Sequence, residues 1–132
     1  MRTLLLVALA GTLALGCAGA SRVKGRIVEN GKPIAVEGQA AVMIYLIGAD
    51  GQPDASKAYP MSLAADGSFE LVGSGGEVPP GTYMVTIEVN GPKSTTGMGR
   101  YKGLFGYPGS PLRQQIKAGS NDLTVDLAKP GP

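Results

Sequence analysis

The chain is most constrained by residues 66 to 89, where two stretches of alternating side chains flank a turn-forming segment. The first stretch follows Asp66-Gly67, a pair that favours a tight turn because both residues tolerate positive φ. Beyond this turn, apolar Phe69 and Leu71 alternate with polar neighbours. This is the period of a half-buried strand, so residues 68–71 are predicted to form one.

The second alternation begins after Pro79, Pro80 and Gly81, which interrupt the chain. Its apolar face carries Tyr83, Val85, Ile87 and Val89, and its opposite face carries Thr82, Met84, Thr86 and Glu88. We expect the two strands to form a hairpin whose apolar faces pack against another sheet and whose opposite faces meet solvent. The side chains expected to line the space between sheets are Phe69, Leu71, Tyr83, Val85, Ile87, Leu123 and Val125.

Other segments have the composition of strands, namely residues 23–28, 32–34, 39–47, 59–63 and 123–127. Asn30-Gly31 predicts a hairpin turn, and Pro33 places the return at a sheet edge because proline cannot donate to a ladder. The segment 39–47 is apolar on both faces, so a loop or a partner must cover its second face. A buried helix is the alternative there, but the β-branched content favours a strand.

Residues 51–56 and 93–117 are expected to be loops between these strands. Frequent turn signals and short alternating segments, with no amphipathic helix among them, are typical of a β-sandwich. The sequence therefore predicts an all-β fold, a small antiparallel β-sandwich of six to seven strands.

The N-terminal segment has the composition of an export signal. Arg2 precedes an apolar run, Leu4 to Leu15, that is shorter than the about 20 residues needed to span a bilayer. The run ends in Gly16-Cys17, which resembles the lipobox of bacterial lipoproteins, in which the cysteine is lipidated and becomes the mature N-terminus. An ordinary secretory signal, with a cysteine there by chance, is the alternative. The expected organisation is a signal peptide over 1–16, a lipidated tether over 17–22, a β-sandwich domain over 23–128 and a tail over 129–132.

Composition argues against several classes of function. The formal net charge of +2, with no basic run, gives no reason to expect nucleic-acid binding. The chain has no histidine, the commonest general base and metal ligand, and its single cysteine is Cys17. The neighbours Ser56-Lys57 and Lys93-Ser94 could supply a Ser-Lys dyad, but chance adjacency explains them better. We therefore expect no catalytic residue, no metal and no cofactor.

Two pairs of acids could in principle do chemistry. Asp50 and Asp54 could offer oxygens to Ca²⁺, and Glu70 and Glu88 could approach each other if their strands pair. Turns recruit aspartate for backbone reasons, and glutamate is common on solvated strand faces. Solvated side chains are therefore the simpler interpretation of both pairs.

At the level of motifs, the chain resembles the carboxypeptidase regulatory-like domain. The resemblance lies in Val23 to Val28, Gly31 to Ile34, Asp66 to Phe69 and Pro80 to Tyr83, while residues 101–127 are similar to short bacterial lipoproteins of this type. The resemblance implies a transthyretin-like (prealbumin-like) sandwich of seven strands. Its motifs are turn and core positions, so no active site is carried over. The hydroxyisourate hydrolase activity of some transthyretin-like proteins is not expected, because it depends on histidines and a C-terminal Tyr-Arg-Gly-Ser signature that this chain lacks.

One segment has the composition of a binding loop. Residues 97–112 contain five glycines and three aromatic residues. Arg100, Tyr101, Lys102, Phe105 and Tyr107 are the candidate binding residues, expected to form an apolar patch bordered by cations. The alternative is that the rings fold back and close one end of the sandwich.

Together these features predict a non-enzymatic module of the cell envelope, attached to a membrane through lipid on Cys17 and binding or scaffolding another envelope protein or glycan. The alternative is a small carbohydrate- or peptide-binding lipoprotein that acts through loop 97–112. Ala18, rather than aspartate, follows the cysteine. By resemblance to other lipoproteins, this favours the periplasmic face of an outer membrane if the host has one.

Overall fold

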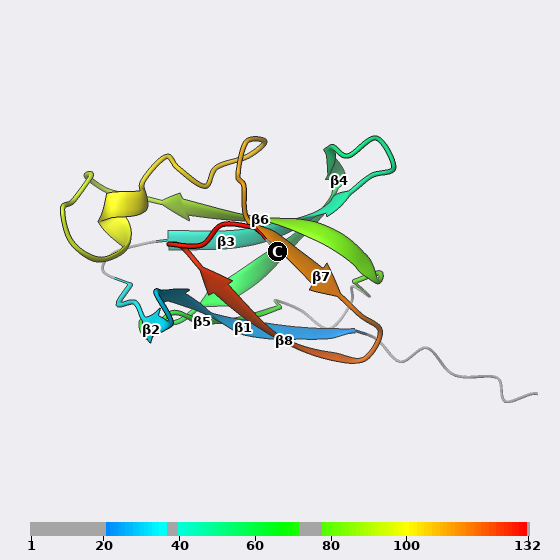
Figure 1. Cartoon of the computed structure of the whole chain (residues 1–132), viewed down its shortest axis with the longest axis horizontal. Coiled ribbons are helices and arrows are strands. Elements are labelled where there is room, and N and C mark those ends of the chain that lie inside the picture. The colour runs from blue at the N-terminus through cyan, green and yellow to red at the C-terminus, as the bar shows by residue number, and fades with distance from the viewer. Residues whose placement is uncertain (1–20, 37–39, 72–77, 132) are drawn as a thin grey trace, which may run out of the picture.

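A computed structural model describes residues 21–36, 40–71 and 78–131, and these ranges contain eight strands and one short 3₁₀ helix (Figure 1). The elements are β1 (Arg22–Glu29), β2 (Lys32–Pro33), β3 (Ala40–Ile47), β4 (Pro53–Leu63), β5 (Ser68–Leu71), β6 (Gly81–Val89), η1 (Gly97–Tyr101), β7 (Arg113–Ile116) and β8 (Ser120–Asp126). In this part of the chain no helix is long and apolar enough to cross a membrane.

The strands form one curled sheet that folds over into two facing layers (Figure 1). One layer contains β8, β1 and β5, with β2 also paired to β1, and the other contains β3, β6 and β7. The long strand β4 pairs with β3 and then with β5, so it joins the two layers. The strand pairs are antiparallel except β1 with β8, which run parallel. The prediction of a small all-β sandwich is confirmed, and the parallel pair is a feature that the sequence patterns did not reveal.

The turn after β1 forms where the sequence predicted it. Asn30 and Gly31 both have positive φ, 50° and 76°, as a two-residue hairpin loop requires. The carboxylate of Asp126 accepts hydrogen bonds from both of their backbone N–H groups, at 3.0 and 3.2 Å. Although desolvation acts to raise it, the pKa of Asp126 is lowered overall by hydrogen bonds from Ala128, Asn30 and Gly31. The turn is therefore fastened to the end of β8.

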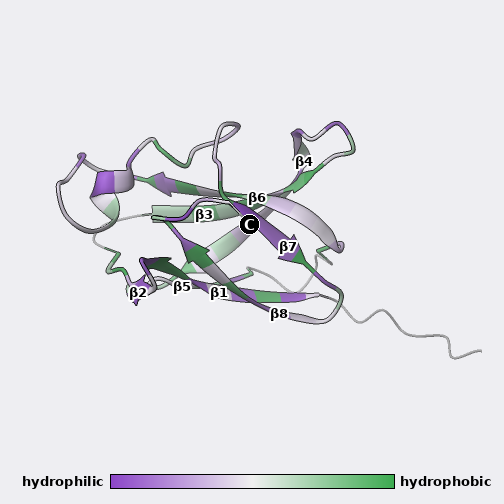
Figure 2. Ribbon diagram, viewed as in Figure 1, coloured by the Kyte–Doolittle hydropathy of each residue, from purple (hydrophilic) through white to green (hydrophobic). Residues whose placement is uncertain are grey.

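The core lies between the two layers and has the composition that the alternation predicted. Apolar and polar residues alternate along most of β1, as Figure 2 shows. Six of the seven predicted core side chains are buried, and Leu71 packs against them partly buried. The fully buried Tyr83 donates its hydroxyl to the carbonyl oxygen of Pro79 at 2.7 Å, and burial raises the pKa of Tyr83 to about 12.

Gly25 occupies a core-facing position on β1 where no side chain fits. A Cβ atom there would lie 2.5 Å from the end of the Phe69 ring and 2.6 Å from the backbone oxygen of Leu123. Both distances are too short for real contacts, so the close approach of β5 and β8 to β1 requires glycine at this position.

The predicted hairpin between residues 68–71 and 82–89 is wrong. β5 pairs with β1 and β4, whereas β6 pairs with β3 and β7, so the two strands lie in different layers. A short separation along the chain suggested a hairpin, but strand pairing is decided by the whole sheet. Each strand nevertheless turns its apolar face inward as expected.

Two predicted loops contain strands. Residues 53–56 extend β4 rather than forming a loop, and residues 93–117 contain η1 and β7. β7 has the sequence Arg-Gln-Gln-Ile and buries only Ile116. Its three polar residues give no apolar alternation, so the sequence did not predict this strand. The expected tether also ends earlier than predicted, because Arg22 begins β1 and the hydroxyl of the buried Ser21 donates to the carbonyl of Lys117 at 3.3 Å.

The expectation that the second face of β6 meets solvent is wrong for Met84 and Thr86, which are 0% and 1% exposed. The chain after η1 reaches this face, because its Tyr107 packs against Tyr45, the register partner of Met84. Its Ser110 is itself buried and donates its hydroxyl to the Val85 carbonyl of β6. The prediction that a loop or a partner covers the second face of residues 39–47 agrees with this arrangement, because Tyr107 of the same loop packs against Tyr45 of β3.

Candidate functional site

The candidate loop, residues 97–112, begins with η1. The residues of η1 contact the core and the end of β1. Met98 of η1 is fully buried in the core, and Arg100 forms an ion pair with Glu29 at the end of β1. The hydrogen bond with Glu29 raises the pKa of Arg100. The ammonium group of Lys102 donates to the carbonyl of Gly91. Both predicted cations therefore hold the loop in place as well as facing solvent.

The three loop rings do not form one exposed patch, so that expectation is wrong. Phe105 is only 5% exposed and belongs to the core, and its carbonyl accepts a 2.9 Å hydrogen bond from the N–H of Ile87. Tyr101 is partly buried, with its ring 5.6 Å from that of Phe105, and desolvation, followed by interaction with Glu29, raises its pKa. These two rings extend the core alongside β6, to which Phe105 forms a backbone bridge at Ile87.

Tyr107 is different, because it is 43% exposed. Its ring centre lies 4.8 Å from that of Tyr45 on β3, so one side of the ring has a partner while the rest of the side chain is accessible. Leu104, three residues earlier, is 57% exposed. We call Leu104, Tyr107 and the underlying Tyr45 the Tyr107 surface. Leu104 was not predicted as a binding residue, although an isolated leucine in a glycine-rich loop is a signal that could have identified it.

The loop that carries this surface is fixed to the sheet on both sides of Tyr107. Before it, Phe105 bonds to the backbone of β6; after it, the N–H of Ser110 donates to the carbonyl of Gly106 at 2.9 Å. The Ser110 side chain then bonds to β6, as described above. Exposed apolar atoms on a fixed backbone are well suited to binding, because little loop motion must be frozen on association.

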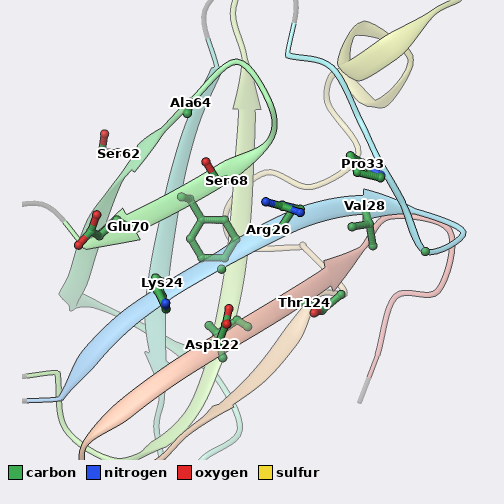
Figure 3. Close-up of a pocket in the computed structure, with 14 residues that line it drawn as sticks. Lys24, Arg26, Val28, Pro33, Ser62, Ala64, Ser68, Glu70, Asp122 and Thr124 are labelled. Carbon is green, nitrogen blue, oxygen red and sulfur yellow. The ribbon is translucent and has the colours of Figure 1, made fainter.

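A second candidate is a polar groove of about 820 Å³ on the outer face of β1, β5 and β8 (Figure 3). Lys24 lies between Glu70 of β5 and Asp122 of β8, which are its register partners. Arg26, two residues further along β1, has Ser68 and Thr124 as its register partners. Opposite charges at neighbouring positions stabilise sheets, so this arrangement accounts for the pattern without a ligand. The sequence analysis did not identify this groove, because its members come from three separated segments.

The acidic pairs are not brought into catalytic or metal-binding arrangements. Asp50 accepts a hydrogen bond from the N–H of Gln52, and Asp54 accepts two from Ser56, which lower the pKa of Asp54. Glu70 and Glu88 lie on strands that do not pair. Within the described ranges, no group of three or more acidic, cysteine or histidine residues could hold a metal ion.

The Ser-Lys neighbours are also accounted for by local hydrogen bonds. The Ser56 hydroxyl donates to Asp54 at 2.6 Å, and the Ser94 hydroxyl lies 3.3 Å from that of Thr96. Neither serine has a hydrogen bond to the adjacent lysine among the bonds of the described residues.

The predicted lipidation site, Cys17, and the predicted signal peptide, residues 1–16, lie outside the described residues. Comparison of the chain with protein-family models, with curated proteins and with solved structures found no match.

Proposed function

We propose that this protein is a lipid-anchored, non-enzymatic module of the cell envelope that binds or scaffolds another envelope component. The single observation that carries the binding role is the Tyr107 surface, where two large apolar side chains, Tyr107 and Leu104, are exposed on a loop fixed to the sheet. Tyrosine is enriched among the residues that anchor protein interfaces. The lipid anchor rests on the Gly16-Cys17 motif after a short apolar run.

The fold supports this arrangement by separating the anchor from η1, the helix with which loop 97–112 begins. Only Ala18 to Ser21 would connect a lipidated Cys17 to β1, whose first residue bonds to Gly119 in the β7–β8 turn. β1 then extends through eight residues, roughly 23 Å, to Glu29, which pairs with Arg100 of η1. A lipid at Cys17 would therefore hold the Ser21 end near the membrane and direct η1 away from it. In a host with an outer membrane, we place the domain on its periplasmic face.

The alternative function is binding of a carbohydrate or a peptide through loop 97–112. It is favoured by the accessible part of the Tyr107 ring, because sugars and prolines pack against aromatic faces. Under this alternative the ligand is a short oligosaccharide or peptide, and loop 97–112 alone forms the binding site.

We also propose that the domain is of the carboxypeptidase regulatory-like type. Support comes from the positions that carried the resemblance: Asn30-Gly31 and Gly67 form positive-φ turns, and Phe69 and Tyr83 are core residues. These positions define a framework, so this proposal adds no activity.

The anchor is tested by growing cells that express the protein with radioactive palmitate. We expect label on the wild-type protein and none on Cys17→Ala, with the variant retaining its signal peptide. Wild-type protein that is secreted without label would disprove the lipid anchor and favour the ordinary secretory signal.

Binding is tested by retention of an envelope protein fraction and of purified peptidoglycan on the immobilised protein. Leu104→Ser with Tyr107→Ser should abolish retention of the specific partner, whereas the matched exposed pair Lys117→Ser with Ala118→Ser should not. Retention of glycan alone supports the alternative. Equal retention by both variants would disprove a role for the Tyr107 surface, and turnover in a panel of hydrolase substrates would disprove the non-enzymatic assignment.

A further inference from the structure

The open side of the curled sheet lies between β7 and β8, two strands that follow one another in the chain but do not pair with each other. Among the described residues, β7 pairs with β6 alone and β8 pairs with β1 alone. Between them is a hollow of about 550 Å³, lined by residues of both strands and by Gly131. We call this hollow the seam. It is distinct from the Tyr107 surface and from the polar groove.

The residues of β8 that bond to β1 reveal which of its other backbone groups face the seam. The N–H of Arg22 donates to Gly119 and the N–H of Leu127 donates to Val28, both at 2.9 Å. In a parallel pair the bonding residues of one strand alternate, so the odd-numbered residues of β8 bond to β1. The N–H and C=O groups of Asp122 and Thr124 therefore point into the seam.

The same reasoning applies to β7. The N–H of Val85 donates to the carbonyl of Leu112 at 3.0 Å, and in an antiparallel pair the bonded residues again alternate. Gln114 and Ile116 thus bond to β6, and the backbone groups of Arg113 and Gln115 point into the seam. Two strand edges whose backbone groups do not pair with each other consequently face each other.

A side chain spans the seam where a strand would lie. The amide of Gln114 donates to the Thr124 carbonyl at 3.0 Å, and at the closed end Asn121 bonds to both backbone groups of Lys117. This Thr124 bond confirms that the even-numbered carbonyls of β8 face β7. It is a single exposed hydrogen bond, so an incoming backbone could replace it at little cost.

The edge of β8 has little of the usual protection against strand pairing. Edge strands are commonly protected by proline, by lysine or by being very short, and β2 shows all three features in its two residues, Lys32 and Pro33. β8 has seven residues and contains neither proline nor lysine, and its charged residues are Asp122 and Asp126. On this edge the Thr124 carbonyl accepts from Gln114 and the Asp126 carbonyl accepts from the N–H of Lys129 at 3.2 Å. The template for an extended chain is therefore centred on Asp122 and the N–H of Thr124.

We propose that the seam accepts an extended segment of a partner polypeptide, which adds to the sheet as a strand against β8. Backbone pairing would provide the affinity. Buried Leu123 and Ile116 flank the inner side of the seam, so we expect apolar residues at alternate positions of the segment and polar residues at the others. A second folded copy fits poorly, because its β8 edge faces its own β7 and cannot enter another seam as a single extended strand. This proposal depends neither on the lipid anchor nor on the Tyr107 surface.

The test uses a phage-displayed library of random nine-residue peptides selected on the full-length protein in detergent micelles. Selected peptides should alternate apolar and polar residues. On binding, they should slow hydrogen exchange at the backbone amides of Arg113, Gln115, Asp122 and Thr124, measured by NMR. Little change is expected at the odd-numbered amides of β8, which are already bonded to β1.

Thr124→Pro is the decisive variant, because it removes one N–H that faces the seam and leaves the β1 ladder intact. It should remain folded and lose at least tenfold in peptide affinity, while Thr124→Ala, which keeps the N–H, should bind like wild type. Selection of no peptide, or equal binding by Thr124→Pro, would overturn the proposal. Amide protection that depends on protein concentration without peptide would also overturn it, in favour of self-association.

Discussion

The aromatic residues of loop 97–112 allow a direct test of which side chains stabilise the fold and which bind a partner. Phe105 and Tyr107 are two residues apart, yet one is 5% exposed and belongs to the core while the other is 43% exposed. Replacing each with serine removes a ring of similar size from the same loop. The structure predicts very different consequences for the two changes.

The magnitudes follow from burial. Loss of the Phe105 ring removes nearly all of its buried apolar contact and leaves a cavity beside β6, which costs about 3–5 kcal/mol for large aromatic truncations. Tyr107 loses its packing against Tyr45, and an aromatic pair contributes about 0.5–1.5 kcal/mol beyond area burial. The two variants should therefore differ by roughly 2–4 kcal/mol, a large share of the about 5–15 kcal/mol that stabilises a typical domain.

Differential scanning calorimetry of the two purified variants is the assay. For a domain of this size, about 4 °C of melting temperature accompanies each kcal/mol, so Phe105→Ser should melt roughly 8–16 °C below Tyr107→Ser. Partner binding should show the reverse order, with Tyr107→Ser losing more. Equal melting temperatures would refute the reasoning, because Phe105 would then not be the core residue that its burial indicates.

Three further outcomes are expected from the packing and the hydrogen bonds. Gly25→Ala should lower the melting temperature by the equivalent of about 1–3 kcal/mol, because its Cβ would meet a backbone oxygen of β8 at 2.6 Å; an unchanged melting temperature would contradict this close packing. Val85→Asp and Thr86→Asp should both unfold the domain at room temperature by circular dichroism, since both positions are at most 1% exposed and a buried, unpaired carboxylate costs several kcal/mol; a mild Thr86→Asp would show that the loop does not cover this face. Hydrogen bonds from the Ser68 side chain and N–H lower the pKa of Asp66 from 3.8, so their stabilising effect is present above that pH and is lost as the pH falls through the lowered pKa. Thermal melts should accordingly show Ser68→Ala differing from wild type more at pH 7 than at about pH 2, and a difference independent of pH would argue against the Asp66 contribution.

The candidate site could be predicted only in part from the sequence. Composition identified loop 97–112 and its rings, but it could not separate Phe105, which enters the core, from Tyr107, which does not. It also treated Arg100 and Lys102 as a cationic border, whereas they bond to Glu29 and Gly91 from distant segments. Burial and ion pairing depend on which surfaces meet, and the order of residues within one loop carries little information about that.

The sequence by itself determined the turns and the faces of the strands. Asn30-Gly31 and Asp66-Gly67 specify reversals through their own backbone preferences, and a period of two assigns Phe69, Val85 and Ile87 to one side whatever lies opposite. Only the tertiary structure decided the partners: β5 and β6 lie in different layers, β8 runs parallel to β1, and Thr86 on the second face of β6 is buried. Strand pairing and loop covering join residues far apart in the chain, and they are selected by the total surface buried, which no local pattern encodes.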